Sequence, residues 1–197
     1  MKCFALLVTF LLTFTIGYGQ TNIKTPFGFK KLYIEMSSDD LEDEMGKPQE
    51  IRSFEDEKKV WVNGGFDLKK AIVYHIGFDQ VYIYDYQNKY CLWKAYIKEG
   101  KVVYMNLTGR WVKDEYVNNV TIRNELHFYD RIEKFEEVLG KNFFPDRNFG
   151  YTDYLYHDLG IRFTFKQSKM TNIYLFRRFT NMADLYKYAR YYPKDKP

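Results

Sequence analysis

Three histidines are the first residues to test for chemistry, because imidazole can act as an acid, a base or a metal ligand near neutral pH. His75, His127 and His157 are far apart in the sequence, and no two of them have the spacing of a metal-binding pair. His157 is followed by Asp158, so these two could form half of an acid–base pair. We interpret the histidines as strand-end residues with structural hydrogen bonds. The sequence therefore predicts no metal, no cofactor and no catalytic residue.

Other catalytic signatures are also missing. The sequence contains neither a nucleophile elbow around a serine nor a glycine-rich phosphate loop, and we interpret Asn63-Gly64-Gly65 as a hairpin turn. The acidic run at 39–44 lacks the alternating spacing of a calcium loop and is better placed to stabilise a helix N-terminus. An exported hydrolase of unknown mechanism, with His157 or His75 as general base, stays open as the alternative function.

Charge and cysteine content narrow the class of protein. The chain has 30 basic and 26 acidic residues, a net charge of +4, which is too mild to predict binding to nucleic acid or to an anionic membrane. Cys91 is the only cysteine after residue 19, so we expect no disulfide framework. We expect Cys91 to be a small buried residue, with a reactive thiol or an intermolecular disulfide as the alternative.

The first nineteen residues have the layout of a signal peptide: Lys2, an apolar run at 4–16, and the small residues Gly17 and Gly19. The apolar run is shorter than the about 20 residues that span a bilayer, so we predict a cleaved signal peptide, with a retained membrane anchor as the alternative. Cys3 precedes this run, so it is not placed as a lipid-modified cysteine. We expect an exported protein, periplasmic or secreted, without a membrane anchor once residues 1–19 are removed.

One stretch occurs twice and predicts most of the architecture. WKAYIKEGKVVYMNL at 93–107 returns as IRFTFKQSKMTNIYL at 161–175, an offset of 68. In both copies apolar and polar residues alternate around a two-residue turn, Glu99-Gly100 or Gln167-Ser168, which predicts an antiparallel hairpin.

A helix is predicted before each hairpin. The first, at 36–48, has Ser37 as N-cap and Gly46 as its end; the second, at 130–141, has Asp130 as N-cap and Gly140 as its end. The two glycines are 94 apart, so the first unit carries 26 extra residues between its helix and its hairpin.

Those extra residues are predicted to form strands. We expect a loop at 49–59 and strands at 60–62, 71–76 and 81–86. Asp153-Tyr154 repeats Asp85-Tyr86 at the hairpin offset.

The predicted fold class is α+β. Two tandem helix-plus-antiparallel-sheet units, 20–113 and 114–197, should pack as one domain, because one helix cannot bury a sheet face alone. The first unit has the extra strands, and the second ends in a short helix at 181–190. The expected core is Leu41, Met45, Trp93, Ala95, Ile97, Val103, Met105, Leu107, Phe135, Leu139, Ile161, Phe163, Phe165, Ile173 and Leu175, and Thr171 is expected on the apolar side of its hairpin.

Two short segments carry a family resemblance. Residues 34–37 (IEMS) and 45–48 (MGKP) resemble the opening of the small periplasmic proteins grouped with the outer-membrane assembly lipoprotein SmpA/OmlA. The tandem units resemble the β-lactamase inhibitor protein fold. The departures are the missing lipid-anchoring cysteine, the 26-residue insertion and the absence of a counterpart to Pro48 after Lys141. The resemblance implies a non-catalytic protein-binding scaffold in the cell envelope or outside it.

The remaining candidate site is the outward side of the two hairpins. If the helices cover one side of the sheet, the other side is open, and tyrosine and arginine dominate binding hot spots. We expect a protein or peptide to bind there, although these residues could instead merely solvate an exposed sheet. The predicted partner face consists of Lys94, Tyr96, Lys98, Tyr104, Arg162, Lys166 and Tyr174.

Overall fold

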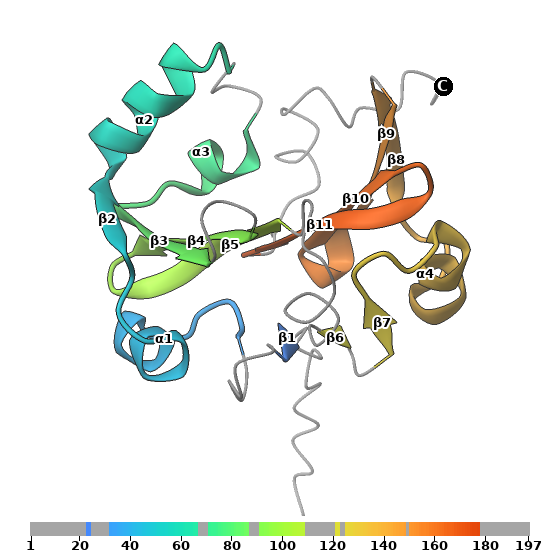
Figure 1. Ribbon diagram of the computed structural model, residues 1–197, viewed down its shortest axis with the longest axis horizontal. Helices are drawn as coiled ribbons and strands as arrows, with labels where there is room; N and C mark the ends of the chain where they lie inside the picture. Colours follow the sequence, from blue (N-terminus) through green and yellow to red (C-terminus); the bar gives the residue numbers. More distant parts are fainter. Residues whose placement is uncertain are drawn as a thin grey trace, which may run out of the picture.

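The computed structural model describes residues 23–24, 32–66, 71–86, 91–108, 121–122, 125–148 and 150–177 (Figure 1). The predicted signal peptide, the predicted helix at 181–190 and the boundary between residues 113 and 114 lie outside these ranges, as does the Cys91 side chain. Among the described residues, no helix has the length and apolar character needed to cross a bilayer.

The structure is α+β, as predicted. The first unit contains α1 (Ser38–Met45), β2 (Glu50–Ser53), α2 (Phe54–Asn63), α3 (Ile72–Ile76), β3 (Gln80–Tyr86), β4 (Cys91–Lys98) and β5 (Lys101–Thr108). The second contains β7 (Leu126–His127), α4 (Ile132–Leu139), β8 (Phe144–Asn148), β9 (Tyr151–Tyr156), the 3₁₀ turn η2 (His157–Leu159), β10 (Ile161–Lys166) and β11 (Lys169–Phe176). Two further short strands, β1 (Ile23–Lys24) and β6 (Thr121–Ile122), form a small sheet with β7.

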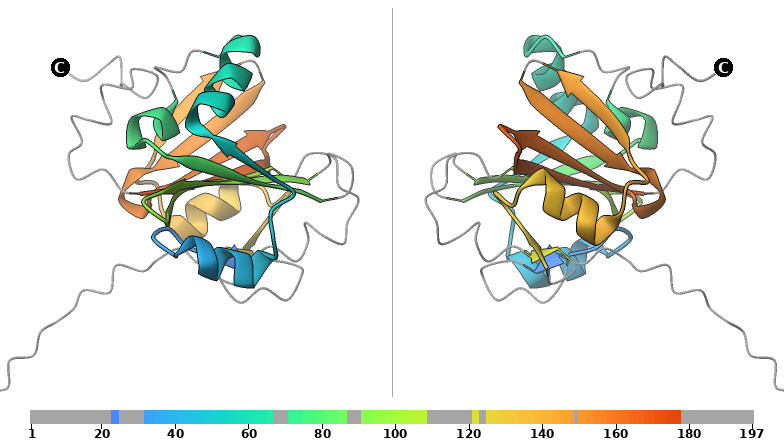
Figure 2. Two further views of the ribbon diagram at one scale, coloured as in Figure 1. Left: turned by 90° about the vertical axis from the view of Figure 1, so that its left-hand side faces the viewer. Right: turned by 90° about the vertical axis from the view of Figure 1, so that its right-hand side faces the viewer.

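One eight-stranded sheet joins the two units. Its strand order is β2-β3-β4-β5-β11-β10-β9-β8, and every neighbouring pair is antiparallel. The units meet where β5 pairs with β11, with Leu107 opposite Ile173. Helices α1 and α4 lie on the lower side of the sheet, whereas α2 and α3 lie on its upper side, over the first unit (Figures 1 and 2).

The repeat is visible in backbone geometry. Each hairpin has a bulge at the same place, between Tyr96 and Ile97 in one copy and between Thr164 and Phe165 in the other. The chain just before each helix also pairs with the following hairpin, as Ser37 with Lys101 and Arg131 with Lys169. Gly46 and Gly140 end their helices with φ of 77° and 79°, a conformation that favours glycine.

The strand registers correct the predicted insertion. Glu50 lies opposite Ile83, and Phe144 lies opposite Leu155, so the offset of 94 extends through β2 and becomes 72 at β3. The insertion is therefore 94 minus 72, or 22, residues between β2 and β3, and four more between β3 and β4. The predicted match of Asp85-Tyr86 with Asp153-Tyr154 is wrong by four residues.

The predicted strand at 81–86 is confirmed as part of β3, whereas the described residues before it form helices and not the other two predicted strands. Residues 60–62 lie within α2 and residues 72–76 form α3, while 49–59 contains β2 and most of α2 instead of a loop. Ser53 caps α2 by accepting a hydrogen bond from the Asp56 amide at 3.2 Å. Gly64 ends α2, so the Asn63-Gly64-Gly65 segment is a helix terminus and not a hairpin turn.

The predicted cap of the second helix is also wrong. Arg131 is the N-cap residue of α4, and its side chain makes no capping hydrogen bond. The Asp130 carboxylate instead accepts hydrogen bonds from the His127 amide at 2.7 Å and from Lys134 Nζ at 2.9 Å. Asp130 is thus held by the turn before the helix.

The core has two parts, one on each side of the sheet. The lower cluster lies under α1 and α4 and contains most of the predicted core, with Leu139 half-buried at its margin. Val103 is buried, but the bulge turns it into the upper cluster, and Val102 takes the lower position. In the second hairpin the bulge likewise buries Met170 in the lower cluster and leaves Thr171 half-buried. The upper cluster was not predicted.

Candidate binding face

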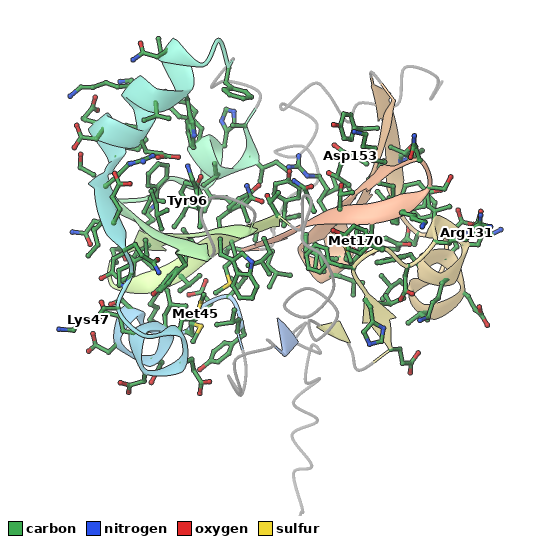
Figure 3. All side chains as sticks on the ribbon, in the orientation of Figure 1. Met45, Lys47, Tyr96, Arg131, Asp153 and Met170 are labelled. Atoms are coloured by element: carbon green, nitrogen blue, oxygen red, sulfur yellow. The ribbon has the colours of Figure 1, made fainter. Side chains whose placement is uncertain are left out.

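The upper side of the first unit is covered, which contradicts the prediction that this side is open. Tyr96 and Tyr104 are 3% and 5% exposed. The ring of Tyr96 contacts Trp61 of α2 and Phe78, with ring centroids 6.1 and 4.9 Å apart. Figure 3 shows Tyr96 between α2 and the sheet. These two tyrosines therefore belong to the core, because the unpredicted helices pack on them.

The first unit's lysines are engaged by the same helices. Lys94 Nζ donates to Glu57 Oε1 at 2.5 Å, and Arg52 Nη1 donates to Glu57 Oε2 at 3.0 Å. Glu57 is fully buried, so these two cations offset the cost of burying its charge. Lys98 Nζ donates at 3.2 Å to the Ile76 carbonyl at the end of α3. These two lysines therefore attach α2 and α3 to the sheet.

Burial also perturbs the chemistry of Tyr96. Its removal from water raises the pKa of its phenol well above the ordinary value of about 10, and the negative charge of nearby Glu57 raises it further. The Tyr96 hydroxyl therefore stays neutral, and it lies 3.5 Å from Glu57 Oε1. It is not poised to act as an acid or base.

Among its described residues the second unit has no helix between β8 and β9, where the first unit has α2 and α3 between β2 and β3, and several equivalent positions on the same side are polar. At the offsets set by the registers, Tyr96 corresponds to Thr164, Tyr104 to Asn172, and Val81 to Asp153. The lower-side positions stay apolar in both units: Tyr82 corresponds to Tyr154, and Met105 to Ile173. Among the described residues, the upper side of the sheet is therefore apolar under α2 and α3, whereas over the second unit polar positions lie beside Leu155 and Phe176, which are buried in the upper cluster.

We name this area the polar face. Its side chains come from β5, β9, β10 and β11, which lie next to one another in the sheet. Asp153, labelled in Figure 3, lies above the second unit on the same side of the sheet as Tyr96. The polar face comprises Asn106, Thr108, Asp153, Arg162, Thr164, Asn172 and Tyr174.

Hydrogen bonds and one stacking contact hold these side chains in place. Asn172 Nδ2 donates to Thr108 Oγ1 at 3.3 Å and to the Tyr174 hydroxyl at 3.1 Å. The Arg162 guanidinium lies 3.8 Å from the centre of the Tyr174 ring, a cation–π contact. The polar face is thus ordered before any partner arrives, which lowers the entropy lost on binding.

Several polar atoms on this face keep unused hydrogen-bonding capacity. Thr164 donates to Asp153 Oδ1 at 2.6 Å, and Thr108 donates to Asn106 Oδ1 at 3.3 Å. Within the described ranges, Asp153 Oδ2, Asn106 Nδ2 and Asn172 Oδ1 take part in no hydrogen bond, and these three side chains are half-buried. The face therefore offers two acceptors and one donor to a partner.

The predicted partner face is consequently divided. Arg162 and Tyr174 belong to the polar face, and half-buried Lys166 lies beside it with Nζ 5.8 Å from the Tyr151 ring. The polar face does not include Lys94, Tyr96, Lys98 or Tyr104. Sequence reasoning missed Asn106, Asp153 and Asn172. A comparison of the repeats at equivalent positions would have found the last two, since polar residues there replace apolar ones.

The histidines do not converge. His75 lies on α3 and is exposed, while His127 lies on β7, on the lower side of the molecule, with Nδ1 3.5 Å from Asp130 Oδ2 (Figure 1). His157 Nε2 lies 2.9 Å from Asp158 Oδ1, but its Nδ1 is buried and has no hydrogen-bond partner among the described residues. A search of the described ranges finds no group of three or more His, Cys, Asp or Glu side chains able to hold a metal ion.

The chain is similar to one family of unknown function and to one solved structure. The model of a domain of unknown function, DUF7738, matches residues 116–196, which include the described strands and helix of the second unit. No curated protein matches the sequence. A 1.5 Å crystal structure of an extracellular protein containing an SCP domain, from Bacillus anthracis strain Ames, is similar at 12% identity with a TM-score of 0.41. The match covers 72% of this chain and 43% of that one, so this chain spans less than half of the other protein.

Proposed function

We propose that this chain is an exported, non-catalytic module that binds another protein through the polar face of its second unit. One observation supports this most: the repeat keeps its lower side apolar in both copies, but the upper-side positions of Val81, Tyr96 and Tyr104, which lie in the upper cluster in the first copy, are Asp153, Thr164 and Asn172 in the second. A face that merely needed solvation would not require an ordered set of hydrogen bonds.

The chemistry of the face indicates the kind of partner. Asp153, Asn106 and Asn172 can accept from and donate to backbone or amide groups, and Arg162 with Tyr174 offers a flat stacked surface. Such shallow, rigid, hydrogen-bonding surfaces suit a protein segment, since strands fix the side chains. Export remains a prediction from residues 1–19, and the resemblance to the SmpA/OmlA and β-lactamase inhibitor proteins stays a prediction as well.

Site-specific photo-crosslinking in exporting cells tests the proposal. A photoreactive residue at position 172 should give a discrete protein adduct, and the same residue at exposed Glu137 of α4 should not. Asp153→Ala, added to the position-172 protein, should remove the adduct without changing the thermal midpoint by more than a few degrees. Equal adducts at both positions, or an adduct that survives Asp153→Ala in a folded protein, would show that the polar face is not the binding site.

The alternative, a hydrolase using His157, has one supporting observation, its 2.9 Å contact with Asp158. A general base needs a ring nitrogen that faces the substrate. Here Nε2 is occupied by Asp158 and Nδ1 is buried, so neither nitrogen is available. Hydrolysis of ester or peptide substrates that His157→Ala abolishes in a folded protein would establish the alternative.

A further inference from the structure

The two edges of the eight-stranded sheet differ in their resistance to further pairing. β2 and β8 are its outer strands, so each has a described neighbour on one side only. The offset of 94 makes the two strands equivalent and places Ile51 at the position of Pro145. Proline lacks an amide N–H and hinders the addition of another strand, so Pro145 protects the β8 edge. Strand β2 contains no proline and lacks this protection.

The strand register shows which backbone groups of β2 face away from the sheet. The Phe54 amide, directly after β2, donates to the Asp79 carbonyl at 3.0 Å, in the same register as β2 and β3. Backbone groups alternate in direction along an antiparallel strand, so those of Arg52 point toward β3 and those of Ile51 and Ser53 point outward. In the left view of Figure 2, β2 crosses the front of the sheet with no described helix or strand before it. Within the described part of the chain, this edge is therefore open to another strand.

The outward position of this edge carries an apolar side chain. Among the exposed large hydrophobic residues of the described ranges, Ile51, at 52% exposure, is the one that lies on a strand. A single exposed isoleucine is ordinary on a protein surface. On an open edge strand it is unusual, because natural proteins place charges or proline there to prevent association. Ile51 thus combines an outward backbone with an apolar side chain, and both favour pairing.

The charges of β2 indicate that the added strand is β2 of a second copy. When two copies run antiparallel with their Ile51 residues opposite each other, Glu50 of each lies opposite Arg52 of the other. Sliding one strand by two residues in either direction puts Glu50 opposite Glu50 or Arg52 opposite Arg52, which is unfavourable. Arg52 already binds Glu50 of its own strand at 2.6 and 2.8 Å. A second copy therefore extends this pair into a cluster of four alternating charges.

We propose that two copies of this chain form a two-fold dimer through an antiparallel β2–β2 pair centred on Ile51. The same patch of both copies makes the contact, so the assembly is closed at two. β2 is four residues long, so the contact is small and the dimer dissociates readily. The polar face lies over β5 and β9 to β11, away from this edge, and pairing does not depend on the proposed protein binding. A dimer carries two polar faces, which would strengthen binding to a partner with two sites.

Analytical ultracentrifugation of the protein, purified as the cell delivers it, tests the proposal. The wild type should show a monomer–dimer equilibrium at concentrations up to about 1 mM. Ile51→Pro gives β2 the residue that the β8 edge has at this position, and it should raise the dissociation constant at least about tenfold by removing the central hydrogen bonds. Its thermal midpoint should stay within a few degrees of the wild-type value, because the Ile51 amide does not face β3. Glu50→Lys should raise the dissociation constant about tenfold, since it places two like-charged pairs opposite each other.

Engineered cysteines test the register. In the proposed dimer the two position-51 Cα atoms lie about 5.5 Å apart, so Ile51→Cys should form an intermolecular disulfide under mild oxidation. Gln49→Cys is the matched control: position 49 is also exposed, but its two copies are displaced by four residues, about 14 Å. Peptide mapping separates a disulfide at position 51 from one that involves Cys91. A wild type that stays monomeric up to about 1 mM would overturn the proposal. A dimer that folded Ile51→Pro leaves intact, or equal crosslinking at positions 49 and 51, would also overturn it.

Discussion

Glu57 is the residue on which the upper layer of the first unit depends most. Its carboxylate is fully buried on α2 and is matched by Lys94 from β4 and Arg52 from β2. Arg52 is itself held by the Glu50 carboxylate, at 2.6 and 2.8 Å. Three elements therefore meet at one charge, and this charge was not recognised in the sequence because 54–63 was not predicted to be a helix.

Neutralising that charge should be costly. We expect Glu57→Gln to lower the free energy of unfolding by about 3 kcal/mol, because Lys94 and Arg52 keep their charges and lose their carboxylate. Glu55→Gln on the exposed side of the same helix should change it by less than about 0.5 kcal/mol. Urea unfolding measures both. Equal effects of the two substitutions would mean that the buried cluster contributes no more than a surface pair.

Tyr96 should make stability sensitive to alkali. Its pKa in the folded protein is raised, first by burial and then by Glu57, so the unfolded chain loses this proton first as pH rises. The stability that the protonated Tyr96 hydroxyl contributes is fully present below about pH 10 and is lost as the pH rises above that value. Tyr156, whose pKa is raised by burial and by the charge of Glu136, acts in the same direction.

We therefore expect the free energy of unfolding of Tyr96→Phe to lie within about 1 kcal/mol of the wild-type value at neutral pH. The hydroxyl that the substitution removes makes only a long contact with Glu57, at 3.5 Å. Above pH 10 the variant should lose less stability than the wild type. Urea unfolding at the two pH values measures the difference. An unchanged or larger alkaline loss in the variant would show that Tyr96 ionises as readily in the folded protein as in the unfolded chain.

At the scale of elements, the two hairpin turns give a matched pair of positions. Both central residues of each turn have positive φ: 50° and 72° at Glu99 and Gly100, 51° and 61° at Gln167 and Ser168. Glycine adopts this region freely, whereas a side chain costs about 1 kcal/mol. The second hairpin is thus strained at Ser168, where the first has glycine.

Exchanging these residues should move stability in opposite directions. Ser168→Gly should raise the free energy of unfolding by about 0.5 kcal/mol. This gain is smaller than the strain removed, because glycine also makes the unfolded chain more flexible and so stabilises the unfolded state. Gly100→Ser should lower it by about 1 kcal/mol. The hydrogen bonds that these turns accept from Ile132 and Ser38 come through backbone carbonyls and are retained. Thermal unfolding of both variants checks the signs, and a shift of the same sign in both would refute the strain argument.

The helices and strands also show how much of the fold could be predicted from the sequence. Helix α1 and both hairpins were predictable, because a capping serine, terminal glycines and alternating residues act locally. The pattern at 60–62 was ambiguous: a run of Val, Trp and Val favours a strand, and only the Ser53 cap with Asp56 three residues on indicated α2. The bulges could not be read from periodicity, and they moved Val103 to the opposite side of the sheet.

The candidate site was harder to predict than the fold. Whether Tyr96 or Tyr174 meets solvent depends on α2 and α3, which lie outside the repeat. A hairpin alone presents two faces and does not show which one another element covers. All seven predicted residues therefore lie on the predicted side of the sheet. Only those of the second unit lie outside the part that α2 and α3 cover.

At the scale of the whole molecule, the two units share one lower core. Met105 and Leu107 of the first unit belong to the same buried cluster as Ile173 and Leu175 of the second. Strand β11 is also an inner strand of the sheet only because β5 pairs with it. A chain without the first unit would expose that edge and half of the cluster to water.

We therefore expect residues 114–197 alone to lack a cooperative thermal transition, although the DUF7738 match, at residues 116–196, lies entirely within this part. Removing the partner half exposes several fully buried side chains, each worth about 1.5–3 kcal/mol, against a total stability of about 5–15 kcal/mol. Adding residues 20–113 in trans should restore a cooperative transition through the β5–β11 pairing. Calorimetry of each half and of the mixture tests this. A sharp transition in residues 114–197 alone, with the same midpoint as the full chain, would mean that the second unit folds independently and that the shared core contributes little to it.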